Sequence, residues 1–278
     1  MSSLLISAAH LAQHVTEVNW IVIDCRHNLA DVDAGRRAYQ AAHIPGAFFL
    51  HLDEDLAGKK NGTNGRHPLP ALKTFAAKLA SIGVDQNKTV VAYDDAGGMF
   101  AVRLWWMLRS LGHNQTLVLD GGITKWLAEN RPVDAHLPQA MPTPFTPNQS
   151  WQPVDADYVL QHLHQPDMLL IDARAPDRFA GQNETLDPVG GHIPGAQNRI
   201  FKNNLDANGC FKKPDELKKE FITILKNTSP QQVVHQCGSG VTACHNLFAM
   251  ELAGLHGSKL YAGSWSEWCA DASRPIEK

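Results

Sequence analysis

The sequence is poor in the features that mark several large classes of protein. None of its apolar runs approaches the roughly 20 residues needed to cross a bilayer. The formal net charge is only −3, so no broad basic surface for nucleic acid or anionic lipid is expected. The five cysteines are odd in number, scattered, and without the paired CxxC spacing of a zinc site. These absences argue against a membrane protein, a nucleic-acid-binding protein, a disulfide framework and a zinc centre.

A basic leader is also missing. The stretch "MSSLLISAAHLAQHV" (1–15) has apolar residues but no preceding positive charge, and therefore predicts a helix beginning near Ser7 rather than a signal peptide. With 44% hydrophobic residues in 278 positions, the chain is long enough for two globular domains. We expect a soluble, cytoplasmic protein.

What the chain does contain is an internal repeat, which changes how every motif is interpreted. Three blocks occur twice in the same order. The pairs are "IVIDCR…AHIPGA" (21–47) with "LLIDAR…GHIPGA" (169–196), 89–112 with 232–254, and "DGGITKW" (120–126) with "AGSWSEW" (262–268). The order of the blocks indicates a duplicated domain.

Each copy alternates β-branched runs, such as "WIVIDC" (20–25), with amphipathic helical patterns, such as 214–227. Continuous apolar runs are typical of parallel strands that helices cover on both faces. We therefore predict two α/β domains, each a mainly parallel sheet flanked by helices on both faces. The predicted boundaries are 1–131 for the first domain, 132–153 for a proline-rich linker, and 154–278 for the second domain.

Cys237 stands where such a sheet binds ligands, at the carboxyl end of a strand and before a helix, in "VVHQCGSGVTACHN" (233–246). Glycines at 238 and 240 permit unusual backbone angles, so the amides of 238–242 can turn inward around an anion. A helix N-terminus lowers a thiol pKa, which predicts a nucleophile at Cys237 rather than a small buried hydrophobe. The predicted active-site loop is Gly238, Ser239, Gly240, Val241 and Thr242, with hydroxyl donors at Ser239 and Thr242. For Cys25, Cys210, Cys244 and Cys269 we expect a structural role.

The first copy has Asp94 at the position that aligns with Cys237. Because a carboxylate cannot perform thiol chemistry, the first domain is expected to be catalytically silent.

Two enzyme classes use a cysteine in such a loop. A phosphatase of the Cys-x5-Arg type needs a guanidinium six positions later to hold the phosphoryl oxygens, and this position is Ala243. Sulfur transfer requires only that the loop stabilise a thiolate and then a persulfide. The sequence therefore favours sulfur transfer.

With its two "HIPGA" blocks, its Asp-for-Cys first copy and "CGSGVTAC", the whole chain resembles the tandem-domain rhodanese-like sulfurtransferases. The loop is most similar to that of the 3-mercaptopyruvate sulfurtransferase branch. The resemblance implies that Cys237 takes sulfur from 3-mercaptopyruvate, releases pyruvate, and passes the sulfur to cyanide or to a thiol such as thioredoxin, with no metal or organic cofactor. Two alternatives stay open: a thiosulfate:cyanide sulfurtransferase, and a non-catalytic sulfur carrier or interaction module.

The resemblance also implies roles for residues outside the loop. Arg178 matches the arginine that contacts the donor's anionic end. A second arginine is expected shortly before "GHIPG", but 182–191 has none, which leaves Arg199 as a substitute; Arg174 in "DAR" is expected to be structural. The family's activating relay maps onto Ser239 with His43 and Asp33, and "GRHPLP" (65–70) suggests that Arg66 and His67 line the site.

Overall fold

The computed structural model describes residues 4–278, which divide into two compact units. The first unit comprises the chain up to Gly58, Leu69–Trp151 and Ala207–Phe211. The second unit comprises Lys59–Pro68, Gln152–Asp206 and Lys212–Lys278. Two short segments, 59–68 and 207–211, therefore belong with the unit of the other repeat copy. Each unit is described separately below.

The first unit is built on a parallel sheet with the strand order β1-β5-β4-β2-β3. Its strands are β1 (Leu5–Ile6), β2 (Trp20–Asp24), β3 (Phe48–Phe49), β4 (Thr89–Tyr93) and β5 (Thr116–Leu119). Its helices are α1 (Ala8–His14), α2 (Ala34–Ala41), α3 (Leu72–Ser81), α4 (Ala101–Ser110) and α5 (Gly122–Ala128). Ser7 caps α1, as predicted, by accepting a hydrogen bond from His10 N. The apolar side chains of the central strands, such as Val22 and Val91, pack against α1 and α5 in one core cluster.

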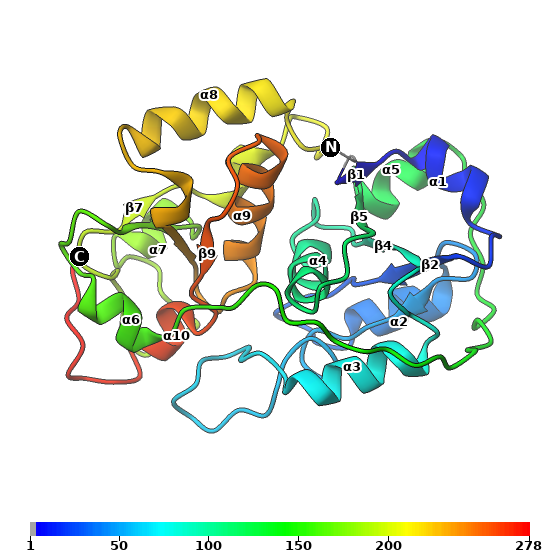
Figure 1. Ribbon diagram of the computed structural model, residues 1–278, viewed down its shortest axis with the longest axis horizontal. Coiled ribbons are helices and arrows are strands. Elements are labelled where there is room, and N and C mark those ends of the chain that lie inside the picture. Colours follow the sequence, from blue (N-terminus) through cyan, green and yellow to red (C-terminus); the bar gives the residue numbers. More distant parts are fainter. Residues whose placement is uncertain (1–3) are drawn as a thin grey trace. The chain divides into compact units, whose positions relative to one another are not determined.

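The second unit repeats this plan with the parallel order β7-β6-β8-β9. Its strands are β6 (Leu169–Asp172), β7 (Gln197–Asn198), β8 (Val233–Gln236) and β9 (Lys259–Leu260). Its helices are α6 (Ala156–Gln161), α7 (Pro176–Phe179), α8 (Pro214–Leu225), α9 (Thr242–Leu252) and α10 (Ser264–Trp268), with 3-10 turns at Phe201–Asn204 and Pro230–Gln232. Figure 1 labels most of these elements.

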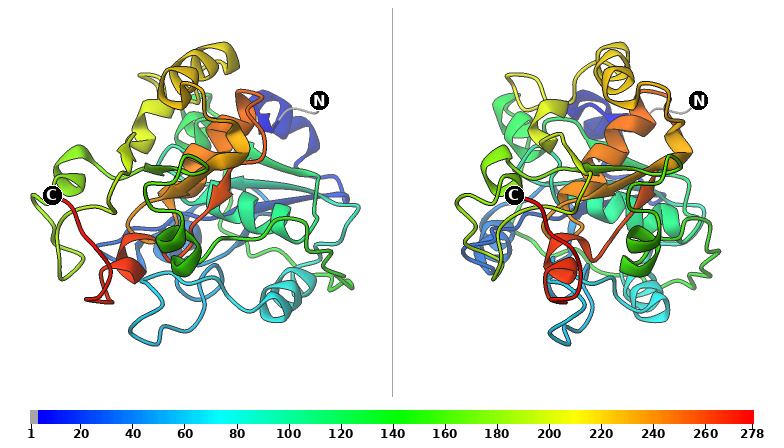
Figure 2. Two further views of the ribbon diagram at one scale, coloured as in Figure 1. Left: turned by 60° about the vertical axis from the view of Figure 1, so that its left-hand side comes forward. Right: turned by 90° about the vertical axis from the view of Figure 1, so that its left-hand side faces the viewer.

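Both faces of the second sheet are apolar and covered. Leu170 and Val234 point to one face, into a cluster with residues of α6 and α10. Ile171 and Val233, one position away on the same strands, point to the other face and pack against α8 and α9. Figures 1 and 2 show these two helix pairs on opposite sides of the strands. The α/β class predicted from continuous apolar runs is thereby confirmed.

The repeat also preserves two polar contacts. Arg26 pairs with Asp24 at 2.6 Å, and Arg174 pairs with Asp172 at 2.7 Å; all four side chains are buried. Each arginine also donates to a backbone carbonyl just before its "HIPGA" block. Arg174 therefore fastens the sheet to its own loop, in agreement with the structural role expected for it.

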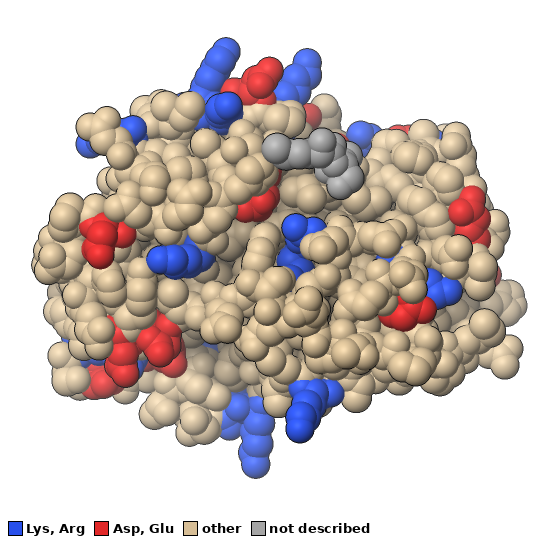
Figure 3. Space-filling model, in the orientation of Figure 1, with Lys and Arg blue, Asp and Glu red and all other residues tan. Residues whose placement is uncertain are grey.

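Two further observations concern the rest of the chain. Residues 135–153 contain no helix or strand, as the density of prolines predicts. In the part of the chain that the structure describes, no helix combines the length and apolar character needed to cross a membrane. On the face drawn in Figure 3, cationic and anionic side chains are scattered without a broad field of one sign.

Candidate active site

Cys237 is the first residue after β8, and the backbone on both sides of its side chain is anchored. Its N–H donates to Ser264 Oγ at 3.1 Å, and its carbonyl accepts from Trp265 N at 2.9 Å. The Cys237 thiol is buried, and Ser239 N–H donates to its Sγ at 3.5 Å. The position of the sulfur is thus set by short-range contacts within the second unit, including one amide N–H that donates to it.

The two loop glycines do different work. Gly240 has a φ of +76°, and a Cβ there would lie 2.3 Å from Ala262 O, so the turn requires glycine. Gly238 does not have a positive φ, which corrects the expectation that both glycines supply unusual backbone angles. At 238 the missing side chain instead makes room, because a Cβ would lie 2.7 Å from Arg66 Nη2.

The remaining loop residues begin the following helix. Val241 caps α9 with ordinary helical angles, and Thr242 is its first residue; both side chains are buried. Cys244, one turn further on, donates its thiol to Gly240 O at 3.3 Å. The loop therefore contacts its own helix, which ends before Gly254, a glycine with a φ of +72°.

Ser264 is a site residue that the sequence analysis missed. Its φ of 55° lies in the left-handed region, which is costly for a residue with a Cβ. Its Oγ donates to Tyr261 O at 2.9 Å and accepts from Cys237 N. The aligned residue of the first copy is Gly122, with a φ of +56°. The sequence did contain a signal for this residue, because the second copy has a serine where the first copy has a glycine.

Ser239 contacts a histidine, but not the one expected. His67 Nδ1 lies 2.7 Å from Ser239 Oγ, and both side chains are buried. His43 instead lies in the first unit, where its ring contacts Tyr39 O at 2.7 Å and His136 O at 3.2 Å. His192, its equivalent in the second copy, contacts a backbone carbonyl in the same way. The prediction that His43 partners Ser239 is therefore replaced by His67.

Two other residues named from the resemblance have local partners. Asp33 is an exposed residue at the start of α2, 3.8 Å from Arg36. Arg199 is buried, donates to Asn204 and Glu220, and lies over the Phe221 ring at 4.2 Å. These contacts give each residue a packing role in its own unit.

Arg178 has a companion at the loop. A Cβ at Gly238 would lie 2.7 Å from Arg66 Nη2 and 3.7 Å from Arg178 Nη1. The second guanidinium, absent from 182–191, thus comes from a distant part of the sequence. Arg66 reaches this position because its backbone N–H donates to Ser266 Oγ at 3.0 Å, within the segment that also anchors Cys237.

Both arginines also meet carboxylates. Arg178 forms a two-point contact with Glu184, with distances of 2.8 to 3.1 Å. Arg66 Nη1 donates to Asp187, which also lies 3.5 Å from Arg178 Nη2. Burial raises the pKa of Asp187, which Arg66 offsets only in part and Glu184 increases further.

The other cysteines have surroundings different from those of Cys237. Burial raises the pKa of Cys25 well above its usual range, and it raises that of Cys269 to about 11. Cys210 lies 3.4 Å from Lys125 Nζ, a contact for which the sequence holds no local signal. Cys25 and Cys269 therefore have the inert character of buried structural thiols.

The first copy shows what its loop does with Asp94. Asp94 Oδ1 accepts from Ala96 N at 2.8 Å and Gly98 N at 2.9 Å, and Oδ2 accepts from Phe100 N at 2.7 Å and Ala101 N at 2.9 Å. Burial raises the pKa of this carboxyl and the four amides lower it in part. The aspartate therefore fills its own backbone nest with a carboxylate.

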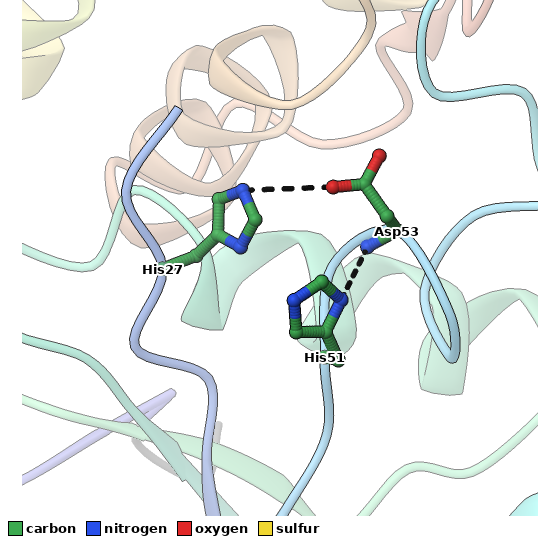
Figure 4. A group of neighbouring side chains, drawn as sticks. All are labelled: His27, His51 and Asp53. Atoms are coloured by element: carbon green, nitrogen blue, oxygen red, sulfur yellow. Dashed lines mark hydrogen bonds and ion pairs between the residues drawn. The ribbon is translucent and has the colours of Figure 1, made fainter. Parts of the chain in front are cut away.

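One group of described side chains has metal-binding residue types. Potential ligand atoms of His27, His51 and Asp53 lie within 4.8 Å of one another. In Figure 4, His27 faces the Asp53 carboxylate and His51 Nδ1 faces Asp53 N. The first distance is 3.7 Å and the second is 3.2 Å. Because His51 Nε2 also contacts Val32 O at 2.8 Å, both His51 nitrogens are already engaged. Without His51, only His27 and Asp53 of this group could bind a metal, whereas zinc sites use three or four protein ligands. We therefore interpret the group as a polar cluster held by hydrogen bonds and an ion pair.

Comparison with protein families gives two matches in this chain. A family profile described as "Rhodanese-like domain" matches residues 7–129 and again residues 155–271. The two matches correspond to the two copies of the repeat.

Comparison with individual proteins extends over the whole chain. The "Probable 3-mercaptopyruvate sulfurtransferase" of Pseudomonas aeruginosa is 44% identical over 99% of this chain and 98% of its own length. The "Thiosulfate sulfurtransferase" of Rattus norvegicus is 36% identical over 84% of this chain and 79% of its own length. A solved structure, the 3-mercaptopyruvate sulfurtransferase from Leishmania major, superposes with a TM-score of 0.87 at 29% identity. This match covers 99% of this chain and 76% of that one.

Proposed function

The chain belongs to the rhodanese-like family, and from that membership we propose that it is a sulfurtransferase that takes sulfur from 3-mercaptopyruvate. The Cys237 thiolate attacks the donor sulfur, and the carbon–sulfur bond breaks. The electron pair of that bond stays on carbon as the enolate of pyruvate, which then takes up a proton. An acceptor thiolate, or cyanide, attacks the outer sulfur of the persulfide, and Cys237 leaves as a thiolate.

The observation that carries this proposal is the way Cys237 is held. Its backbone is fixed by Ser264 and Trp265, and its Sγ receives an N–H from Ser239. A fixed sulfur beside an amide donor at a helix N-terminus is the environment that favours a reactive thiolate. The aligned Asp94 shows that the fold forms without a thiol at this position.

Two groups beside the sulfur supply the other functions that the reaction needs. Arg66 and Arg178 converge on the space next to Gly238, and guanidinium groups bind carboxylates with well-defined geometry. Ser239 Oγ, 2.7 Å from His67 Nδ1, can exchange a proton with that histidine. We assign Arg66 and Arg178 to donor binding, and Ser239 with His67 to proton transfer.

The neutral loop favours a singly charged donor. Gly238, Ser239 and Gly240 carry no cation, whereas thiosulfate is doubly charged. Thiosulfate stays the second candidate donor because a relative named for that activity is 36% identical. For the acceptor we propose a thiol such as thioredoxin, and for the location the cytoplasm. The first domain, with Asp94, is proposed to be catalytically silent.

A single substitution tests the proposal. In Cys237→Ser we expect no release of pyruvate from 3-mercaptopyruvate and, by mass spectrometry, no added sulfur atom on the protein. Cys210→Ser, which alters a thiol of the first unit, is the matched control and should retain both. Substantial turnover in Cys237→Ser would reject the mechanism. A protein that takes up no sulfur at Cys237 even in the unaltered chain would favour a non-catalytic interaction module.

A further inference from the structure

Four charged side chains meet beside Gly238, two of each sign. Arg66 Nη1 binds Asp187, while its Nη2 lies 2.7 Å from the position of a Cβ at Gly238. Arg178 Nη2 and Nη1 lie 3.6 and 3.7 Å from the same position, and Nη2 also binds Glu184 at 2.8 Å. Each guanidinium therefore meets a carboxylate of the protein and also lies beside the loop.

The two carboxylates are held in different ways. Glu184 also accepts from Leu186 N at 2.9 Å and from Asp187 N at 3.1 Å, so its position is set by the backbone. Burial opposes its ionisation, but these amides and Arg178 outweigh the burial and lower its pKa. The carboxylate of Asp187 binds the two arginines, and only 3% of its side chain is exposed. Asp187 is therefore held in place by the same two arginines that would bind a donor.

This arrangement sets the charge that an incoming donor meets. Arg66 and Arg178 contribute two positive charges, and Glu184 and Asp187 cancel both. A carboxylate can still bind, because its two oxygens match Arg66 Nη2 and Arg178 Nη1, which both lie beside Gly238. Because these four charges sum to zero, a second negative charge on the donor gains no net attraction from them, whereas without Asp187 it would.

We propose that Asp187 is a specificity-determining residue that competes with the donor for Arg66 and Arg178 and thereby selects singly charged donors over doubly charged ones. The inference rests on the proposed function, since it assigns Asp187 to the donor site of that reaction. It accounts for a carboxylate in the segment where the family resemblance leads one to expect an arginine.

The inference predicts a shift in donor preference. In Asp187→Asn, which keeps the shape of the side chain, we expect kcat/KM for thiosulfate to rise about tenfold more than kcat/KM for 3-mercaptopyruvate, since the dianion loses one more repulsion. Glu216→Gln removes an exposed carboxylate of α8 and should leave the ratio of the two donors unchanged. An unchanged ratio in Asp187→Asn overturns the inference and leaves sulfur transfer intact.

A binding measurement separates this inference from the proposed reaction. Pyruvate and thiosulfate are titrated calorimetrically into Cys237→Ser, with and without Asp187→Asn, so that no turnover is needed. We expect the double variant to gain about tenfold in affinity for thiosulfate relative to pyruvate. Equal gains for both anions, or no binding of either anion by either protein, would overturn the assignment of Asp187.

Discussion

The loop after β4 and the loop after β8 follow the same strand, turn and helix but treat their first residue differently. In the first copy Asp94 takes four backbone N–H donors onto its carboxylate. In the second copy Cys237 takes one N–H onto its sulfur, from Ser239. A loop whose amides bind the carboxylate of its own aspartate is stable but has no free nucleophile. A loop that surrounds a thiol can instead accept a second sulfur atom.

Two more positions separate the copies. Gly122 in the first copy is Ser264 in the second, and both have a φ near 55°. Ala92 in β4 aligns with His235 in β8, a buried residue two positions before Cys237. In both cases the second copy has the residue that is more costly to fold. The differences suggest that stability has been exchanged for the placement of Cys237.

Replacing Asp94 by asparagine should produce the largest change in stability. The asparagine oxygen can still accept from Ala96 and Gly98, but its NH2 group would face the N–H donors of Phe100 and Ala101. Two buried donors without an acceptor should lower the free energy of unfolding by about 3 kcal/mol. Urea unfolding followed by circular dichroism measures this, with the exposed neighbour Asp95→Asn as the control. If the two variants are equally stable, the four hydrogen bonds to the Asp94 carboxylate do not contribute to the stability of the fold.

The next effect is a pH dependence that His235 adds to the second copy. Burial lowers the pKa of His235 from 6.5 to about 3, and Arg199 adds to this. The folded protein therefore keeps His235 neutral, while the unfolded chain takes up a proton below pH 6.5. Stability from this residue is complete above pH 6.5 and is lost as the pH falls toward 3, by about 2 kcal/mol at pH 5.

The test is His235→Leu, which removes the titrating ring from the core. Comparing urea unfolding at pH 7 and pH 5, we expect the variant to lose about 2 kcal/mol less than the unaltered protein. The exposed His136→Gln should behave like the unaltered protein. An equal loss in all three proteins would mean that other groups, such as the buried carboxylates, dominate the acid sensitivity.

The sequence was a good guide to the parts of the site that are local. The strand, Cys237, the loop glycine with positive φ and the helix up to Gly254 all follow from a short stretch and its aligned copy. The family resemblance named His67 and Arg66 as lining the site, but no local pattern indicated their partners, which lie more than 100 positions away. The segment 59–68 lies within the first copy of the repeat but packs in the second unit, and no local pattern encodes that exchange. His43, a histidine in a repeated block, was for that reason mistaken for the partner of Ser239.

The smallest effect is predicted for Ser264→Gly, a substitution that gives the second copy the residue of the first. Ser264→Gly relieves the strain of a left-handed serine but removes the hydroxyl that fixes Cys237 N, so we expect unchanged stability and about a tenfold loss of kcat/KM, equivalent to about 1.4 kcal/mol. Ser264→Ala removes the same hydroxyl but does not relieve the strain, so nothing offsets the lost hydrogen bonds. This variant should therefore lose both activity and about 1 kcal/mol of stability. Unfolding and pyruvate-release assays on the two variants separate strain from positioning. Full activity in Ser264→Gly would show that the hydroxyl does not position Cys237, and that the serine serves only the turn.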